Sequence, residues 1–323
     1  MKAAESSSAI FLSVVVPLYN EEESVNALAG SISEVLTGLG APCEIIFVDD
    51  GSTDRTWSII EALVDSDQTF RALKFRKNFG QTSAMVAGFE SARGEVIVTI
   101  DGDLQNDPAD IPMLLDKISE GYDIVSGWRK NRQDHFSRVL PSRVANYMIS
   151  ATTGVRLHDY GCSLKAYRAE CVKSLKAYGE MHRFFPALAS MTGARVTEVE
   201  VNHYPRQFGI SKYGFNRIFK VFSDIFAMNL IIRFSSCPLK GFAFSAVPFF
   251  LLMFFFLVLG GLAFALGWTP GKALFFLLAG GLCGLSVIYL VVLGVLGELV
   301  VSTSDLTHAQ LPEITKKEIY FSR

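Results

Sequence analysis

The chain has 323 residues, a formal net charge of −2 and a hydrophobic content of 50%. A net charge so close to zero gives no electrostatic reason to expect a nucleic acid as a partner. The mean hydropathy of +0.31 is high for a soluble enzyme. The five cysteines contain no Cys-x-x-Cys pair, which is typical of a reducing compartment and of neither a zinc site nor a disulfide framework.

The first 130 residues alternate short apolar runs with longer amphipathic ones. The pattern predicts strands at 10–16, 44–48, 71–75, 95–100 and 122–126, and helices at 22–36, from 54 onward, at 82–91 and at 108–119. Ser52 or Thr53 is expected to cap the second helix. Alternating strands and helices favour an α/β fold with a doubly wound, mainly parallel sheet, whose ligands bind beyond the carboxyl ends of the strands. Residues 131–205 give weaker patterns, with helices expected at 137–152 and 182–191 and a strand at 195–203.

Acidic residues follow the predicted strand at 95–100. Asp101 and Asp103 are two apart, so they point the same way on an extended chain, with Gln105 beyond them. Three oxygen ligands of this kind suit a hard divalent cation, Mg²⁺ or Mn²⁺, that keeps open positions for water and phosphate. The alternative is a solvated, Asp-rich loop.

A second polar cluster follows the strands at 10–16 and 44–48. Asp50 is placed to accept hydrogen bonds from a base or ribose, Tyr19 offers a ring for stacking, and Asn20 and Glu21 offer further acceptors. Gly51 would allow a ligand to approach the backbone closely. Taken alone, the Asp-Asp-Gly-Ser segment equally fits a turn that precedes a helix.

Basic residues gather later in the chain. They are Arg129, Lys130, Arg132, Arg138 and Arg143, followed by Arg206 and Lys212. A solvated face is the usual explanation of such charge. Because these cations lie in the half of the sequence that leads to the apolar segments, anionic lipid headgroups or a phosphorylated lipid are the natural partners.

Two segments near the carboxyl end, 243–266 and 273–297, contain no charged residue. Each is long enough to cross a bilayer as a helix, which takes roughly 20 residues. The short connection at 267–272 predicts a transmembrane hairpin, and buried helices of a soluble core are the alternative. The segment 215–234 is expected to be an amphipathic helix in the membrane interface or else another packed helix.

The orientation of the hairpin follows from its flanks. Residues 1–8 are polar and lack the apolar stretch of a signal peptide, and Lys or Arg residues lie on both outer sides of the hairpin. We therefore expect both ends on the cytoplasmic side. The expected parts are a cytosolic domain at 1–214, interfacial helices at 215–240, two spans within 241–298 and a cytosolic tail at 299–323.

At this point the sequence resembles a known family. VVVPLYNE at 14–21, VDDGS at 48–52, NFGQ at 78–81 and DGDLQ at 101–105 resemble the family 2 glycosyltransferases of the GT-A fold. HDYGC at 158–162 and RQFGISKY at 206–213 resemble the polyprenyl-phosphate glycosyltransferases, which include dolichyl-phosphate mannose synthase. WRKNRQD at 128–134 looks most like the bacterial polyprenyl-phosphate glucosyltransferases and undecaprenyl-phosphate aminoarabinose-type transferases of that group.

The resemblance implies inverting transfer of a sugar from a nucleotide diphosphate sugar, with UDP favoured over GDP, to polyprenyl (undecaprenyl) phosphate. The product would serve cell-envelope glycosylation, such as lipopolysaccharide modification, at the cytoplasmic face of the inner membrane. The metal, Mg²⁺ or Mn²⁺, would be held by Asp101, Asp103 and Gln105. The implied donor-binding residues are Pro17, Tyr19, Asn20, Glu21, Asp50, Gly51, Lys77, Asp101, Arg206 and Lys212. Arg129 and Arg143 would bind the acceptor phosphate, and the implied catalytic residues are Asp103, Asp159, Arg129 and Arg143.

Two other functions are alternatives to this one. A processive polysaccharide synthase of the same superfamily would carry a Gln-x-x-Arg-Trp motif after Asp103, and the sequence has none. A catalytically inactive membrane scaffold would be favoured by loss of an acid in the metal site, but all three expected ligands are present. The motifs leave the sugar open among glucose, a 4-amino-arabinose derivative, a uronic acid and an N-acetylhexosamine.

Two details depart from the family pattern or bear on assembly. GELVVS at 297–302 replaces the Gly-Glu-Tyr-x-Gly-Arg that often follows the second span, so the tail is divergent. Gly280 and Gly284 have GxxxG spacing. They would either pack the second span against the first or form a contact between protomers of a homo-oligomer.

Overall fold

The computed structural model describes residues 10–130, 146, 149–150, 154–173, 181–190, 193–205, 238–303 and 315–319. The predicted helix at 215–234, and all but three residues of the one at 137–152, lie outside this range. The chain divides into two compact units, residues 1–224 with 308–323 and residues 225–307. Each is described by itself.

The first unit is built on an eight-stranded sheet with the strand order β7-β5-β6-β4-β1-β2-β3-β8. The strands are β1 (Leu12–Leu18), β2 (Cys43–Asp49), β3 (Phe70–Phe75), β4 (Val96–Thr99), β5 (Ile124–Trp128), β6 (Lys165–Arg168), β7 (Val196–Glu200) and β8 (Thr315–Ile319). β1 to β4 are mutually parallel, as are β5 and β7, whereas β6 is antiparallel to β4 and β5 and β8 is antiparallel to β3. The mainly parallel α/β fold is thereby confirmed.

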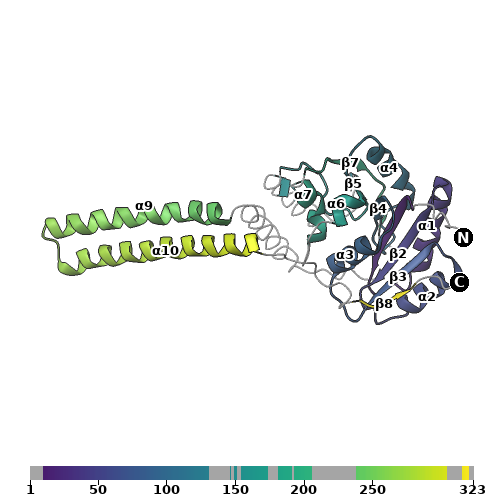
Figure 1. Cartoon of the computed structure of the whole chain (residues 1–323), viewed down its shortest axis with the longest axis horizontal. Helices are drawn as coiled ribbons and strands as arrows, with labels where there is room; N and C mark the ends of the chain where they lie inside the picture. Colours follow the sequence, from purple (N-terminus) through teal and green to yellow (C-terminus); the bar gives the residue numbers. More distant parts are fainter. Residues whose placement is uncertain are drawn as a thin grey trace, which may run out of the picture. The chain divides into compact units, whose positions relative to one another are not determined.

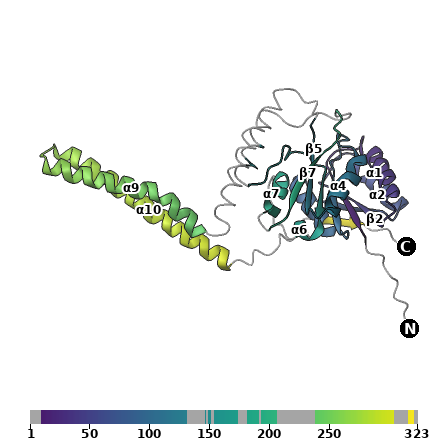
Figure 2. The same ribbon diagram turned by 90° about the horizontal axis from the view of Figure 1, so that it is seen from above.

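Helices cover both faces of this sheet (Figures 1 and 2). They are α1 (Val25–Leu39), α2 (Thr56–Ser66), α3 (Gln81–Ser91), the short 3₁₀ turn η1 (Pro108–Asp110), α4 (Ile111–Ser119), α6 (Ala169–Lys173), η2 (Met181–Phe184) and α7 (Phe185–Ser190). Residues of α1, α2 and α4 share one hydrophobic cluster with Val14 and Val16, and residues of α3, α6 and α7 share the other with Val15. This alternation along β1 is what the two-residue period of a strand dictates.

Three features of this unit differ from the sequence prediction. β6 and β8 were not predicted, because Lys-Ala-Tyr-Arg and Thr-Lys-Lys-Glu-Ile contain no apolar run of the kind that marks a buried strand. The prediction that Ser52 or Thr53 caps the second helix was wrong. α2 begins at Thr56, and the Asp54 side chain accepts a hydrogen bond from the Thr56 amide at 3.0 Å. Ser52 is instead engaged with the loop after β1.

A buried carboxylate organises the edge of the sheet where β2 begins. Glu44, 2% exposed, accepts hydrogen bonds from Ser13 Oγ at 2.6 Å, from Arg71 Nη1 at 2.9 Å and from the Arg93 amide at 2.7 Å. Burial alone would raise the pKa of Glu44. The hydrogen bonds and the charge of Arg71 outweigh burial and lower this pKa below its ordinary 4.5. The network ties β1, β2 and β3 together at the edge opposite their carboxyl ends.

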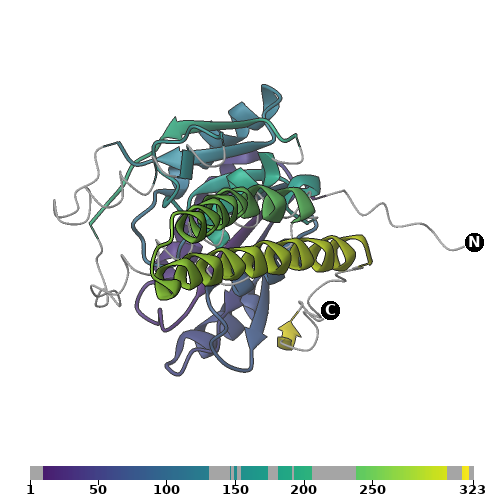
Figure 3. The same cartoon turned by 90° about the vertical axis from the view of Figure 1, so that its left-hand side faces the viewer.

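The second unit is an antiparallel pair of long helices, α9 (Pro238–Ala265) and α10 (Pro270–Thr303), which lie side by side (Figure 3). Both are long and apolar enough to cross a membrane by length and composition. Gly280 packs against α9, since a Cβ added there would lie 3.1 Å from the Leu257 side chain, whereas one on Gly281 would meet nothing within 4 Å. Of the two uses of GxxxG, the structure shows packing within the hairpin. Glu298 accepts a hydrogen bond from the Leu239 amide at 3.2 Å and so caps the first turn of α9.

Candidate active site

Two loops at the carboxyl ends of β1 and β2 are joined by hydrogen bonds. The Asn20 amide donates to Ser52 Oγ at 2.9 Å, and the Thr53 amide donates to Asn20 Oδ1 at 2.8 Å. Asn20 has a left-handed φ of 53°, a conformation that asparagine tolerates better than most residues. The Glu21 amide donates to Thr56 Oγ1 at 2.8 Å. The loop that carries the predicted donor-binding residues Asn20 and Glu21 is therefore fixed to the loop after β2.

Asp50 ties a third loop to the end of β2. It is 4% exposed, and its two carboxylate oxygens accept hydrogen bonds from the amides of Phe79 and Gly80 at 2.7 and 2.9 Å. Burial raises the pKa of Asp50 to about 6, against the effect of these hydrogen bonds. Gly51 has a φ of 73°, and a Cβ there would lie 2.5 Å from the carbonyl carbon of Lys77. The close approach at Gly51 is thus made by the chain's own backbone.

The same loop reaches the predicted metal site. Gln81, the first residue of α3, donates its side-chain amide to Asp101 Oδ1 at 2.7 Å. Gly80, directly before it, is bound to Asp50. The carboxylates that follow β2 and β4 are therefore linked through adjacent residues, which supports one shared site. The sequence presented Gln81 within a family motif but gave it no role.

The loop after β4 carries the predicted metal ligands. Asp103 Oδ1 accepts a hydrogen bond from the Gln105 amide at 3.2 Å, across Leu104 with its left-handed φ of 58°. Gln105 is held by Tyr204, whose amide donates to the Gln105 carbonyl at 2.9 Å and whose carbonyl accepts from Gln105 Nε2 at 3.4 Å. Because its nitrogen makes this contact, Oε1 is the side-chain atom of Gln105 that can serve a cation.

The charges at Asp101 and Asp103 fit a divalent cation. Burial, and then the charge of Asp103, raise the pKa of Asp101 to about 6, although a hydrogen bond from Ser163 and the charge of Arg129 oppose them. Two adjacent carboxylates repel each other, and a cation between them removes that repulsion. In the described ranges no three His, Cys, Asp or Glu side chains form a metal group. Two carboxylates and one amide oxygen instead suit Mg²⁺ or Mn²⁺ that takes further ligands from substrate phosphates.

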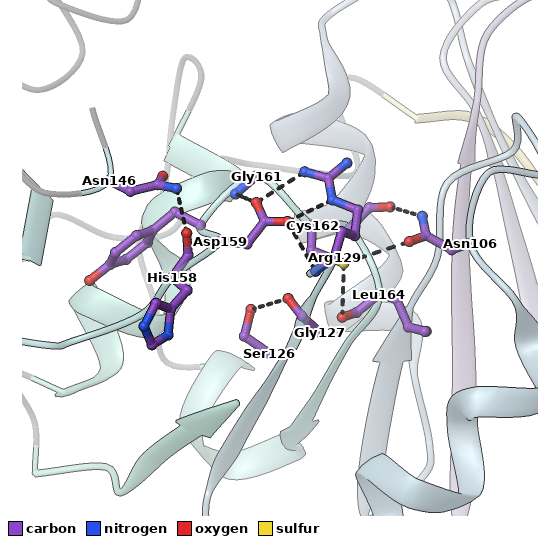
Figure 4. Close-up of polar contacts among 12 residues, drawn as sticks. Asn106, Ser126, Gly127, Arg129, Asn146, His158, Asp159, Gly161, Cys162 and Leu164 are labelled. Carbon is purple, nitrogen blue, oxygen red and sulfur yellow. Dashed lines mark hydrogen bonds and ion pairs between the residues drawn. The ribbon is translucent and has the colours of Figure 1, made fainter. Parts of the chain in front are cut away.

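Arg129 and Asp159 form a buried ion pair beside these acids (Figure 4). Arg129 Nε and Nη2 contact the two oxygens of Asp159 at 2.6 and 3.0 Å, and the Gly161 amide donates to Asp159 Oδ1 at 3.0 Å. The side chains are 11% and 7% exposed. Burial lowers the pKa of Arg129, but the hydrogen bonds and charge of Asp159 more than reverse this and raise it. A Cβ on Gly161 would lie 3.2 Å from Arg129 Nη2, so this glycine leaves room for the guanidinium.

Lys165, which sequence reasoning missed, is a buried residue near the Arg129–Asp159 pair. Lys165 is 3% exposed, and its ammonium donates to the carbonyls of Tyr160, at 3.2 Å, and Cys162. Lys165 is the first residue of β6, a strand that no apolar pattern predicted. Only its place just after the family-like segment HDYGC could have indicated it.

The outer rim of this region is aromatic. Trp128 and His158 stack with their ring centres 4.3 Å apart and an angle of 18° between planes. His158 donates its backbone amide to Glu198 Oε2 at 2.8 Å, and its Nδ1 contacts the other oxygen of Glu198. Asn146 Nδ2 donates to the His158 carbonyl at 2.6 Å (Figure 4). His158, which precedes Asp159, is thus fixed by contacts with Trp128, Glu198 and Asn146.

The remaining predicted residues are placed less fully. Pro17 and Tyr19 are partly buried near the end of β1, and Lys77 is exposed with its Nζ 5.2 Å from the centre of the Phe79 ring. Arg143, Arg206 and Lys212 lie outside the described residues, so their roles stay predictions.

Comparison with known proteins identifies the family of the chain. The family model for glycosyl transferase family 2 matches residues 13–176, which include the loops after β1, β2 and β4 and the Arg129–Asp159 pair. The chain belongs to this family and is a glycosyltransferase.

Two relatives are similar over nearly the whole chain. The dodecaprenyl-phosphate galacturonate synthase of Rhizobium johnstonii is 41% identical over 300 residues, covering 90% of this chain and 88% of the relative. The undecaprenyl-phosphate 4-deoxy-4-formamido-L-arabinose transferase of Pseudomonas paraeruginosa is 38% identical over 292 residues, covering 89% and 84%. Both are polyprenyl-phosphate glycosyltransferases by name, and the resemblance seen in the motifs is confirmed.

The fold also has solved neighbours. The glucosyl-3-phosphoglycerate synthase of Mycobacterium tuberculosis, in complex with Mn²⁺, UDP and phosphoglyceric acid, superposes with a TM-score of 0.54 and 21% identity over 68% of this chain and 78% of that one. This likeness establishes a shared fold.

Proposed function

We propose that this enzyme transfers a sugar from a UDP-sugar to polyprenyl phosphate and inverts the anomeric configuration. The product is a polyprenyl-phosphate-linked monosaccharide for cell-envelope glycosylation. The single observation that supports this best is the buried Arg129–Asp159 pair beside the acidic loop Asp101–Gln105, because it would put a cation next to the proposed site of the donor diphosphate. Relatives that use polyprenyl phosphate by name support the acceptor.

The acidic loop would hold Mg²⁺ or Mn²⁺ through Asp101, Asp103 and Gln105. A bound cation of this kind neutralises the charge that develops on a departing nucleoside diphosphate. Gln81 holds one oxygen of Asp101 at 2.7 Å and so fixes the direction of the carboxylate. The neighbour that contains Mn²⁺ and UDP supports a metal and a uridine nucleotide in this fold.

The acceptor needs positioning more than it needs a base. A phosphate oxygen is already ionised at neutral pH, so the barrier arises from bringing two anions together. Arg129 has the charge and the fixed direction for this task, because Asp159 binds its Nε and Nη2. Among the described residues Nη1 has no hydrogen-bond partner, so we propose that it binds the acceptor phosphate. We propose that Arg143 joins it at the acceptor phosphate, and that Arg206 and Lys212 act near the donor phosphates.

The same proposal places the enzyme at the inner membrane. Helices α9 and α10 would span the bilayer as a hairpin, so that the chain meets its lipid acceptor in the membrane that carries it. The catalytic unit would face the cytosol, where nucleotide sugars are made.

The test is a transfer assay on the full chain in lipid discs. Polyprenyl phosphate, Mg²⁺ or Mn²⁺ and a panel of nucleotide sugars are supplied, and the lipid product is identified by mass spectrometry. The panel includes UDP-galacturonic acid, UDP-glucose, a UDP-linked 4-formamido-arabinose and UDP-N-acetylglucosamine. One polyprenyl-phosphate-linked monosaccharide is expected. Polymer formation would identify a polysaccharide synthase, and no product from any donor would favour the scaffold.

A matched pair of variants links the product to the proposed metal site. Asp103→Asn is expected to lower the transfer rate at least about a hundredfold, since loss of a charged ligand removes several kcal/mol of transition-state stabilisation. Asp116→Asn, on the exposed face of α4, is the control and should leave the rate unchanged. Equal rates for the two variants would exclude Asp103 from the reaction.

A further inference from the structure

Lys165 is a buried residue near the proposed active site for which the proposed reaction assigns no role. It pairs with Thr99 on one side and with Ser126 on the other. Asp101 follows Thr99 by two residues, and Arg129 follows Ser126 by three. Lys165 therefore lies between the two strands that deliver the predicted metal ligand and the predicted acceptor-binding cation.

The ammonium of Lys165 holds the turn that carries Asp159. Its acceptors are the carbonyls of Tyr160, at 3.2 Å, and Cys162, which lie just after Asp159 in the chain. Asp159 is further fixed by the Gly161 amide at 3.0 Å. The orientation of Arg129 depends on Asp159, so a chain of contacts runs from Lys165 through this turn to the guanidinium.

Lys165 is unusual because lysine side chains are seldom fully buried unless they are paired. Desolvation at 3% exposure lowers the pKa of Lys165, and the nearby charge of Arg129 lowers it further. Cys162, Asp159 and Asp101 act in the opposite direction and favour its charge. A buried cation is costly unless it is hydrogen-bonded and faces negative charge. Lys165 meets both conditions, since it has two carbonyl acceptors and lies near Asp159 and Asp101. A phosphate acceptor bound at this end of β6 would add further negative charge.

We propose that Lys165 is a positioning residue for the acceptor phosphate: it holds the 159–162 turn so that Asp159 keeps the Arg129 guanidinium aimed at the acceptor. This rests on the proposed function, because the acceptor is polyprenyl phosphate. Most of the proposed donor-binding residues lie in the loops after β1, β2 and β4. Both hydrogen bonds of the Lys165 ammonium go to the 159–162 turn instead, although its charge also acts on Asp101.

Three substitutions separate the roles of this side chain. Lys165→Met keeps the length and removes charge and donors. Lys165→Gln keeps a donor without charge, and Lys165→Arg keeps both. The control is Lys173→Met on α6, which also removes an ammonium-to-carbonyl hydrogen bond, to Ala92, but on an exposed side chain beyond the far end of β6.

Binding and kinetics are both measured on the full chain in lipid discs. Lys165→Met should raise the KM for undecaprenyl phosphate about tenfold or more, the effect of losing a charge-assisted contact. It should weaken direct binding of undecaprenyl phosphate, followed by native mass spectrometry without nucleotide, to the same degree. Affinity for UDP with Mn²⁺, measured by calorimetry, should stay within about twofold. Lys165→Arg should restore most acceptor affinity, Lys165→Gln less, and Lys173→Met should match the wild type.

The outcomes also distinguish this proposal from the proposed function. Acceptor binding and KM within twofold of wild type in Lys165→Met would overturn the role of Lys165, as would an equal loss of UDP affinity. If Lys165→Met does not fold, Lys165→Gln carries the same test, because it retains a donor for the turn. A wild-type chain that binds undecaprenyl phosphate but transfers no sugar would refute the proposed function while leaving the binding result to decide on Lys165.

Discussion

Replacing Asp159 by asparagine tests how much the buried ion pair between Arg129 and Asp159 contributes to stability and to acceptor binding. The change leaves the shape of the side chain but removes its charge. One of the two atoms that face Arg129 then becomes an NH₂ group, which cannot accept the short 2.6 Å hydrogen bond from Nε. Because both side chains are about nine-tenths buried, water cannot replace the lost partner.

The expected loss follows from that burial. Breaking a buried ion pair by removing one partner costs about 3–5 kcal/mol, since the other charge remains in place without its counter-charge. For a unit of this size, 1 kcal/mol corresponds to roughly 2–4 °C, so the catalytic unit should melt about 6–20 °C lower. Acceptor affinity should fall as well, because the guanidinium loses its fixed direction.

The assay is thermal unfolding of the full chain in detergent, followed by tryptophan fluorescence. A matched control is the exposed ion pair between Lys130, which follows Arg129, and Glu200, the last residue of β7. Lys130 and Glu200 are also 2.6 Å apart, but their side chains are 53% and 54% exposed. Glu200→Gln should therefore change stability by less than about 1 kcal/mol. Equal melting shifts for Asp159→Asn and Glu200→Gln would refute the argument from burial.

Further predictions concern pH, the acceptor and the hairpin. Because the pKa of Glu44 is lowered in the folded state, its stabilisation is present above pH 4.5 and is lost as pH falls below that value; in Glu44→Gln, acid melts of the catalytic unit should lose this part of their pH dependence. Arg143→Ala should raise the KM for polyprenyl phosphate about tenfold or more and leave UDP affinity unchanged, a split that donor-side binding would reverse. Gly280→Leu should destabilise the hairpin in detergent, by about 1–3 kcal/mol for overpacking, whereas Gly281→Leu should not. If light scattering shows a homo-oligomer that Gly281→Leu dissociates, the protomer contact lies on the open face of α10. Glu298→Ala should lower the helix content of the hairpin on heating, through loss of a cap worth about 1 kcal/mol.

The sequence predicted most of the first half of the fold because its signals are local there. β1 and β2 contain apolar runs, β3 keeps four apolar residues in six, and the helices between them have amphipathic faces, so each element could be placed within a few residues. The acids Asp101 and Asp103 were found because they end such a run. Gln105 followed from spacing, but its contact with Tyr204, distant in sequence, could not.

The contacts among site residues escaped prediction for a different reason. Gln81 and Asp101 are twenty residues apart, and Arg129 and Asp159 thirty, so their pairing depends on the order of strands in the sheet. The family resemblance implied only that Asp159 is a catalytic residue. Its partner became visible only when the structure placed it against Arg129.

The antiparallel strand β6 explains how residues so late in the chain reach the active edge. In a purely parallel sheet, the segment before a strand lies at the edge opposite the ligand. β6 runs against β4 and β5, so it begins where they end. The turn before it, with Asp159, and its first residue, Lys165, therefore arrive beside Asp101 and Arg129. β6 thus brings Asp159 and Lys165, for which we propose roles toward the acceptor, to the same edge of the sheet as the predicted metal ligands. Two charged residues hid β6 from prediction, and of these Lys165 lies at the site end of the strand whereas Arg168 lies at the opposite end, paired with Val96.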